Sequence, residues 1–85
     1  MDGVWMTAAQ SALFAENLAA LRLARQPRLS QALLARRFGI SRSTYDRYEK
    51  GITQPPAWFV IQVARYYGVA VEQLYTQKLP KGRMK

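Results

Sequence analysis

The sequence contains neither cysteine nor histidine. Disulfide bonds and thiolate metal sites are therefore excluded, and the commonest general base and metal ligand is missing as well. The five acidic residues are scattered and suggest no carboxylate pair or metal-binding cluster, being Asp2, Glu16, Asp46, Glu49 and Glu72. We therefore predict no cofactor, no metal and no enzymatic activity.

Long hydrophobic runs are also absent. No apolar stretch approaches the length of a membrane-spanning helix. The N-terminus also lacks the basic region and apolar stretch of a secretory signal. The sequence thus predicts a cytoplasmic protein with no membrane partner.

Positive charge, by contrast, is abundant and unevenly placed. The 85 residues carry a formal net charge of +8. Residues 21–30 and 31–50 carry +3 each and residues 78–85 carry +4, whereas residues 1–20 carry −2. A basic surface concentrated in this way is typical of proteins that bind phosphate groups, as in nucleic acids.

Helical periodicity and capping residues divide the chain. Thr7 and Gln10 have capping-box spacing, and Pro27 biases the chain away from helix, so a helix is predicted from about residue 7 to 25. Further helices are predicted over residues 31–38, 42–50, 56–67 and 69–76. A chain of this length forms one domain, which we assign to residues 7–77, with a loose leader at 1–6 and a basic flexible tail at 78–85. The predicted fold class is all-α.

The stretch from residue 31 to 51 predicts two short helices joined by a tight turn. Ser30 and Ser41 can cap the two helices through their hydroxyls. Gly39 supplies the left-handed conformation that ends the first helix at little cost. The apolar face of that helix is predicted to consist of Leu33, Leu34 and Phe38. This is the helix-turn-helix pattern, in which the second helix enters the major groove of DNA.

The second of these helices has two faces. Tyr45 and Tyr48 point back toward the first helix, and the opposite face carries Arg42, Ser43, Asp46 and Arg47. Arginine can donate two parallel hydrogen bonds to guanine, serine can donate or accept, and a carboxylate can accept from cytosine. The alternative is a solvated face in which Arg42 and Asp46 simply pair one turn apart.

A spaced set of residues resembles the lambda-repressor-like (Xre/Cro-type) helix-turn-helix family of bacterial and phage regulators. The matching positions are Leu21, Arg22, Ser30, Gln31, Leu34, Ala35, Gly39, Ile40, Ser41, Ser43, Thr44, Arg47, Glu49, Gly51, Pro55, Val60, Ala64, Gly68, Val69 and Leu74. The resemblance implies a compact fold of five helices and DNA binding, usually as a dimer. Two departures are Pro56 and Ala70, which stand where the family often has capping hydroxyls.

The resemblance also implies roles for individual residues. Arg22 is expected to pair with Glu49 and hold the first helix to the third, which suits a guanidinium and a carboxylate in a half-buried site. Gln31 is expected to hold a phosphate oxygen at a helix N-terminus. The other candidate phosphate contacts are Ser41, Lys50, Thr53, Gln54, Arg36 and Arg37. For the last two, simple solvation is an equal alternative.

The fourth helix has an excess of large apolar residues. Four of them fall off its inward stripe: Trp58, Phe59, Ile61 and Tyr66. The excess suggests a self-association patch, for which Trp58, Phe59 and Tyr66 are the candidates, although a small core could also bury them. We therefore expect a homodimer that binds double-stranded DNA as a transcriptional regulator, in this class most often a repressor. The alternative is an antitoxin-like or other interaction module whose apolar patch binds a partner protein.

Overall fold

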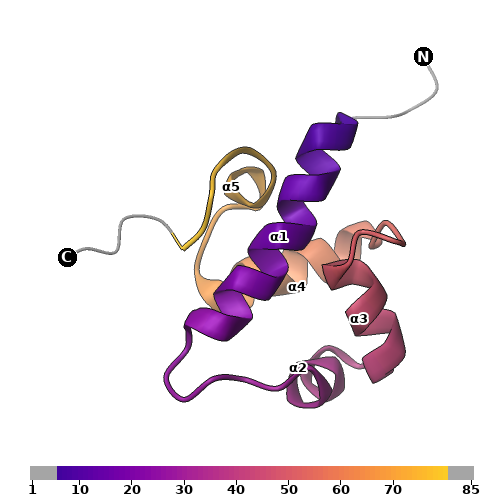
Figure 1. Cartoon of the computed structure of the whole chain (residues 1–85), viewed down its shortest axis with the longest axis vertical. Helices are drawn as coiled ribbons and strands as arrows, with labels where there is room; N and C mark the ends of the chain where they lie inside the picture. The colour runs from indigo at the N-terminus through magenta and orange to yellow at the C-terminus, as the bar shows by residue number, and fades with distance from the viewer. Residues whose placement is uncertain (1–5, 81–85) are drawn as a thin grey trace.

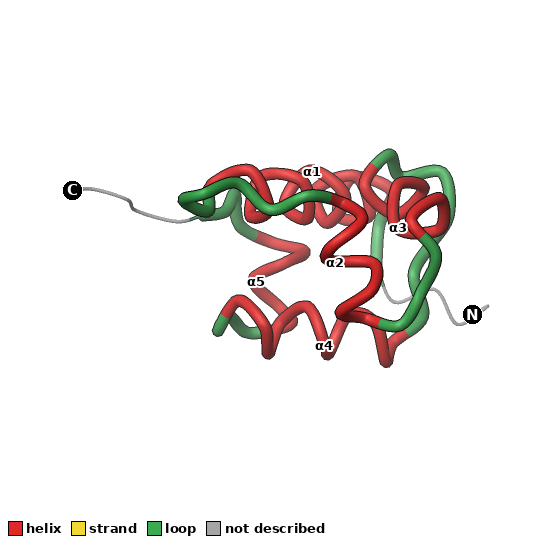
Figure 2. Tube along the Cα trace, turned by 90° about the horizontal axis from the view of Figure 1, so that it is seen from below, coloured by secondary structure: helices red, strands yellow, loops and turns green. Residues whose placement is uncertain are grey.

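The computed structural model describes residues 6–80, and within them the chain forms five helices and no strand. The helices are α1 (Ala8–Ala24), α2 (Gln31–Phe38), α3 (Arg42–Glu49), α4 (Ala57–Tyr67) and α5 (Val71–Thr76). In Figure 1 the long α1 crosses in front of α4, and α3 lies at the right-hand edge. Figure 2 shows α1 and α4 on opposite sides, with α2 and α5 between them. The all-α prediction is confirmed.

Side-chain caps begin the first three helices where the sequence predicts them. Thr7 and Gln10 form a reciprocal capping box at α1. The hydroxyls of Ser30 and Ser41 accept from the amides of Leu33 and Thr44, at 3.0 and 3.1 Å. These bonds satisfy amides that have no partner inside the helix, and so fix where α2 and α3 start.

The last two helices begin without a side-chain cap. Pro56 and Ala70 occupy the N-cap positions of α4 and α5, and neither has a hydroxyl to offer. At α5, Gln73 compensates, because its side-chain oxygen accepts from the amide of Ala70 at 2.8 Å. The two departures from the family pattern thus leave both helices in place.

The core lies between the helices and is rich in aromatic rings. Phe59 is fully buried and packs against rings from two other helices, edge-on to Phe38 at 5.3 Å between centroids and tilted against Tyr48 at 4.7 Å. Its inclusion in a surface patch is therefore wrong. The physical reason is helical spacing: Phe59 lies four residues before Val63, so it shares the inward face of α4.

The other two residues of the expected patch differ from each other. Tyr66 is half-buried, and its ring packs edge-on against Phe38 at 5.7 Å. Trp58 keeps 49% of its surface exposed. Two further apolar side chains are exposed: Ile61 on α4, at 43%, and Leu33 on α2, at 50%. Of the three residues predicted on the apolar face of α2, Leu34 and Phe38 are buried and Leu33 is exposed.

The ends of the domain differ from the predicted boundaries. Leu79 is buried at 6% exposure, and its amide donates to the side chain of Asn17 at 2.8 Å. Residues 78–80 therefore belong to the packed domain, while 81–85 of the expected tail lie outside the described residues. Of the expected leader only Met6 is described. It packs against the core, and its sulfur accepts from Ser11 at 3.2 Å.

Asn17 is a structural residue that the sequence patterns do not signal. It is 2% exposed within α1. Its amide group donates to the carbonyl oxygens of Leu74 (2.9 Å) and Gln77 (2.7 Å), and its oxygen accepts from Leu79. The partners lie 57 to 62 residues away in sequence, so no local pattern could identify them. Asn17 thus holds the segment from Leu74 to Leu79 against α1.

Candidate nucleic-acid interface

The turn between α2 and α3 has the geometry that the sequence predicts. Gly39 ends α2 with φ of +75°, a left-handed conformation that strains any residue with a Cβ atom. The amide of Ile40 then bonds back to the carbonyl of Ala35 at 2.9 Å. These bonds end α2 and turn the chain, so that α3 starts at Arg42, two residues after Ile40, in a different direction.

The inner face of α3 anchors it to the core. Tyr45 is fully buried and Tyr48 is 7% exposed. Burial raises the pKa of the Tyr45 phenol well above its ordinary value, and the neighbouring carboxylate of Glu49 adds to the shift. A helix of eight residues is marginal alone, so these two rings hold α3 in position.

The outer face of α3 is open to solvent and carries cationic and hydroxyl groups. Arg42, Ser43 and Arg47 are all exposed. Arg47 makes no ion pair within the described residues, and the hydroxyl of Ser43 lies 3.4 Å from that of Ser41. Asp46, the fourth expected base contact, is only half exposed and is tied to its own helix by Lys50, with 2.9 Å between Nζ and Oδ2.

An ion pair joins α3 to α1. Arg22 meets the carboxylate of Glu49 with two parallel hydrogen bonds, of 2.7 Å from Nε and 2.9 Å from Nη2. A third guanidinium nitrogen donates to the carbonyl of Leu29 at 3.2 Å. The Glu49 side chain is only 6% exposed. The expected pair is therefore formed, and it fixes α1, the loop before α2, and α3 against one another.

This pair decides the ionisation of Glu49. Burial alone would raise the pKa of its carboxyl group, but the hydrogen bonds from Arg22, the nearby hydroxyl of Tyr45 and the hydrogen bond from Gln31 more than offset it, and the pKa is lowered. The pKa of Asp46 is also lowered, first by its hydrogen bond with Lys50 and then by that with Gln31. Both carboxylates are thus held in the charged form.

Gln31 bridges α2 and α3, a role that its neighbours in sequence do not signal. Its amide nitrogen donates to Asp46 at 2.9 Å and to Glu49 at 3.0 Å, and its oxygen accepts from Arg42 at 2.8 Å. The amide group has two N–H donors, and both are used. The expected phosphate contact would have to displace one of these bonds.

The remaining phosphate candidates lie on several elements. The Ser41 hydroxyl is occupied as the cap of α3, donating in turn to Thr44 at 2.9 Å. Lys50, Thr53 and Gln54 are exposed on the segment that follows α3. Arg36 is exposed on α2, whereas Arg37 lies over the ring of Tyr66 on α4, at 5.0 Å. Arg37 therefore faces α4 and not α3.

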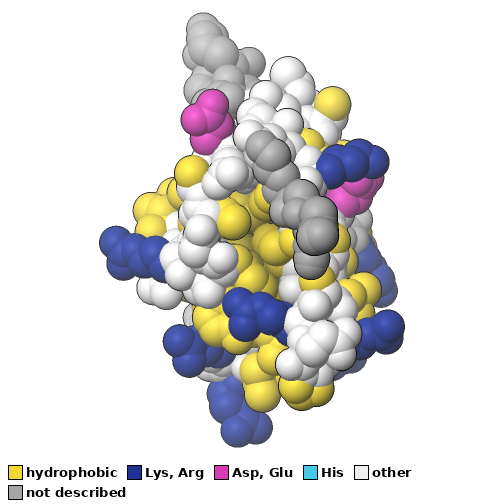
Figure 3. All heavy atoms as spheres, turned by 90° about the vertical axis from the view of Figure 1, so that its left-hand side faces the viewer, with side chains coloured by type: hydrophobic (Ala, Val, Ile, Leu, Met, Phe, Trp, Pro, Cys, Tyr) yellow, Lys and Arg dark blue, Asp and Glu magenta, His cyan; other side chains and the backbone are white. Residues whose placement is uncertain are grey.

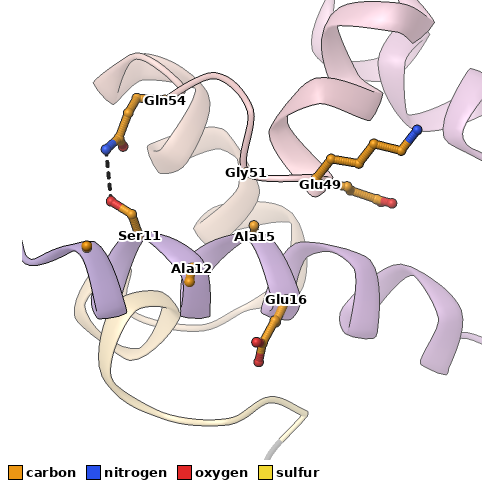
Figure 4. Close-up of a pocket in the computed structure, with 9 residues that line it drawn as sticks. Ser11, Ala12, Ala15, Glu16, Glu49, Gly51 and Gln54 are labelled. Carbon is orange, nitrogen blue, oxygen red and sulfur yellow. Dashed lines mark hydrogen bonds between the residues drawn. The ribbon is translucent and has the colours of Figure 1, made fainter.

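A groove runs between α1 and the segment after α3. It has a volume of about 470 Å³. On one side it is lined by four small residues of α1 and by Glu16, and on the other by Glu49, Lys50, Gly51 and Gln54. Figure 4 shows the side chain of Gln54 reaching across it to Ser11, with 2.8 Å between donor and acceptor. This bond holds the loop against α1 and so fixes the exit from α3.

Comparison with known proteins agrees with this geometry. Residues 13–75 match the helix-turn-helix domain family. The chain belongs to the helix-turn-helix family. Over 62 residues it is 34% identical to the cryptic phage CTXphi transcriptional repressor RstR of Vibrio cholerae. That match covers 73% of the chain and 54% of the relative, so the chain spans about half of the relative's length.

The arrangement of the five helices also has a solved counterpart. The solution structure of the SOS-response transcriptional repressor LexA from Eubacterium rectale superposes with a TM-score of 0.74 at 24% identity. The match covers 96% of this chain and 84% of that one. At this identity the likeness shows the fold alone. The family and fold predicted from the sequence are confirmed. Within residues 6–80, no helix has the length and apolarity to cross a membrane.

Proposed function

We propose that this helix-turn-helix domain binds double-stranded DNA sequence-specifically as a transcriptional regulator, with α3 in the major groove. The observation that carries the proposal is the division of α3 into two faces. Tyr45 and Tyr48 lock one face into the core, while Arg42, Ser43 and Arg47 project from the other. A helix held in this way can present donors to base edges without losing its own packing.

The roles of the exposed side chains follow from their chemistry. Arg42 and Arg47 read base edges, because a guanidinium can donate two hydrogen bonds to guanine. Ser43 supports them as a donor or acceptor. Asp46 mainly positions Gln31 and Lys50 and does not contact a base, since its carboxylate already accepts from Gln31 and pairs with Lys50.

Gln31 is assigned to hold Arg42 and not a phosphate. Its amide oxygen accepts from the Arg42 guanidinium, and its nitrogen is anchored on two carboxylates. An arginine held at a fixed point loses less rotamer freedom on binding a base. Phosphate contacts are then left to Lys50, Thr53 and Gln54 after α3 and to Arg36 on α2. Ser41 at the start of α3 can donate to a phosphate only by giving up its bond to Thr44.

The regulator is proposed to be a repressor and a homodimer. The repressor role is supported by the likeness to RstR, a phage transcriptional repressor. The dimer is supported by the exposed apolar residues Trp58 and Ile61, which lie three apart on α4 and so share a face. Two-fold dimers place recognition helices in successive major grooves.

The test begins with selection of bound sites from random duplex DNA. The preferred duplex and a scrambled one are then titrated with variants at several salt concentrations. Arg42→Ala and Arg47→Ala should each cost about 1–3 kcal/mol on the preferred duplex and relax the choice of one base pair per half-site. Lys50→Ala should weaken both duplexes alike and lower the salt slope by about one unit per monomer.

Two controls make the result decisive. Arg65→Ala removes the same charge from α4 and should leave discrimination between the duplexes unchanged. Gln31→Ala combined with Arg42→Ala should cost less than the sum of the single changes, because the two residues act as one unit. Equal losses on both duplexes for Arg42→Ala and Arg47→Ala would show that these arginines grip phosphates, and the assignment of α3 as the reading element would fail.

A further inference from the structure

A second cluster of arginines lies away from α3. The ring of Tyr66 has the guanidinium of Arg25 at 5.3 Å and that of Arg37 at 5.0 Å from its centroid. Arg25 also lies 5.2 Å from the ring of Tyr67. These distances are within the range of cation–π contact. Three helices thus contribute to one cationic and aromatic surface: the end of α1, α2 and α4.

A hollow of about 150 Å³ opens beside this cluster. It lies between α2 and α4 and is lined by Arg37, Arg65, Gln62, Tyr66 and the edge of Phe38. Two guanidinium groups, a side-chain amide and a phenol therefore converge on a space with an aromatic floor. Each of the first three side chains is exposed, so their donors are open to an incoming group.

Within the part of the chain that the structure describes, no carboxylate forms an ion pair with this surface. Within residues 6–80 the only ion pairs are Arg22–Glu49 and Lys50–Asp46, and both involve α3 or its end. Arg37 and Arg65 pair with no carboxylate in that part of the chain. Figure 3 views the molecule from the side opposite α3. Its lower half shows several dark blue groups around hydrophobic ones, and no magenta.

We propose that Arg25, Arg37, Arg65 and Tyr66, called here the arginine–tyrosine site, bind carboxylate groups of an acidic segment of a partner protein. A guanidinium fork matches a carboxylate with two parallel hydrogen bonds. The rings of Tyr66 and Tyr67 hold the Arg25 guanidinium in place, and Tyr66 does the same for Arg37, which reduces the entropy lost on binding. The inference is independent of the function proposed for α3.

The shape of the hollow favours a carboxylate over the phosphate of a second nucleic acid. A carboxylate stands at the tip of a slender side chain, which can enter a space of about 150 Å³. A phosphodiester is flanked on both sides by sugars and could reach only the rim. The arginines also suit the negative ends of α1, α2 and α4, where cations stabilise the helix dipole. If the arginines only stabilised the helix ends, they would bind no carboxylate. The experiment below distinguishes that structural role from ligand binding.

The experiment uses the full chain with ¹⁵N-labelled arginine side chains, followed by NMR at about 0.15 M salt, where screening removes long-range attraction. The probe is an end-capped peptide of ten glutamates, with a peptide of ten glutamines as the neutral control. The glutamate peptide should shift the Nε–Hε resonances of Arg37 and Arg65 first. Arg42 and Arg47 on α3 should respond only at higher peptide concentration.

Two matched variants test the assignment. Arg37→Gln with Arg65→Gln should weaken peptide binding by roughly tenfold or more, since it removes two charge-assisted pairs. Arg42→Gln with Arg47→Gln removes the same charge from α3 and should change binding by less than about twofold. Arg65→Gln alone keeps the contacts of Arg25 and Arg37 with the rings of Tyr66 and Tyr67. It replaces the double variant in the test if that variant does not fold. It should weaken peptide binding several-fold.

Three outcomes would overturn the proposal. Equal weakening by the two double variants would mean that only net charge matters. Unchanged peptide binding together with a lower melting temperature in Arg37→Gln, Arg65→Gln would assign these arginines to the helix ends. In the third outcome, a short duplex DNA of unrelated sequence displaces the peptide from Arg37 and Arg65, while free glutamate at the same total concentration of negative charge does not. That result would identify the surface as a nucleic-acid contact.

Discussion

Replacing Glu49 by alanine should test how α3 is held. The change removes two hydrogen bonds to Arg22 and one to Gln31. It also leaves the Arg22 guanidinium in a site where that side chain is only 15% exposed. Losing one partner of a buried pair costs about 3–5 kcal/mol, and a half-buried one costs less. We therefore expect Glu49→Ala to lower the free energy of unfolding by about 3 kcal/mol.

A loss of this size is easy to measure in so small a domain. Each 1 kcal/mol corresponds to roughly 4–8 °C in melting temperature for 60–100 residues, so the variant should melt roughly 12–24 °C below wild type. Glu16→Ala is the matched control. Glu16 is exposed and makes no ion pair within the described residues, so its removal should cost less than about 0.5 kcal/mol.

The same pair predicts a pH dependence. The pKa of Glu49 is lower in the folded protein than its ordinary value of 4.5. Its contribution to stability is therefore complete above about pH 4.5 and is lost as the pH falls through the folded-state pKa. Glu49→Gln cannot be protonated, so its melting temperature should fall less steeply than that of wild type below pH 4.5. Arg22→Met added to Glu49→Gln should recover part of the loss, because no charge is then stranded.

One result would refute the reasoning. If Glu49→Ala and Glu16→Ala melted alike at neutral pH, the Arg22–Glu49 pair would contribute no more than an exposed ion pair, which is worth about 0–1 kcal/mol. The attachment of α3 to α1 would then have to come from Tyr45 and Tyr48 alone.

Two further predictions concern the end of the domain and its assembly. Asn17→Ala should lower the free energy of unfolding by about 3 kcal/mol, because two buried polar groups and one partly buried group lose their partner. A thermal melt checks this, and unchanged hydrogen exchange at the Leu79 amide would contradict it. Sedimentation should show a homodimer that Trp58→Ala or Ile61→Asp converts to a monomer. A wild-type chain that is monomeric both free and on a palindromic duplex would remove the dimer proposal.

Much of the fold follows from residues whose effect is local. Thr7, Ser30 and Ser41 each satisfy an amide three residues later, so their influence is readable over a single turn. Gly39 acts through its own φ angle. Such features need no knowledge of distant parts of the chain, which is why the predicted helix boundaries agree with the structure to within one or two residues at most ends.

The errors lie where a decision depends on packing between elements. Phe59 and Trp58 are adjacent large aromatic residues, and the sequence analysis predicts both to lie off the inward stripe. The spacing of Phe59 from Val63 also allows the inward face, and the rings of Phe38, Tyr45 and Tyr48 pack against Phe59 there. Leu33 and Leu34 pose the same problem on α2. A short helix offers too few turns for its periodicity to separate such neighbours.

The surface of α3 shows a further limit of sequence reasoning. Some of its charged side chains are paired with other residues of the protein, so the charge available to a ligand differs from the formal charge of the helix. Lys50 and Asp46 neutralise each other at 2.9 Å, and Gln31 draws Arg42 toward a pair of carboxylates. On this helix Arg47 makes no ion pair within the described residues, while Arg42 is held at a fixed point. Specificity would therefore depend on how firmly Gln31 holds the Arg42 guanidinium toward a base edge. A sequence in which Gln31 were alanine would carry the same net charge and yet present a looser reading face.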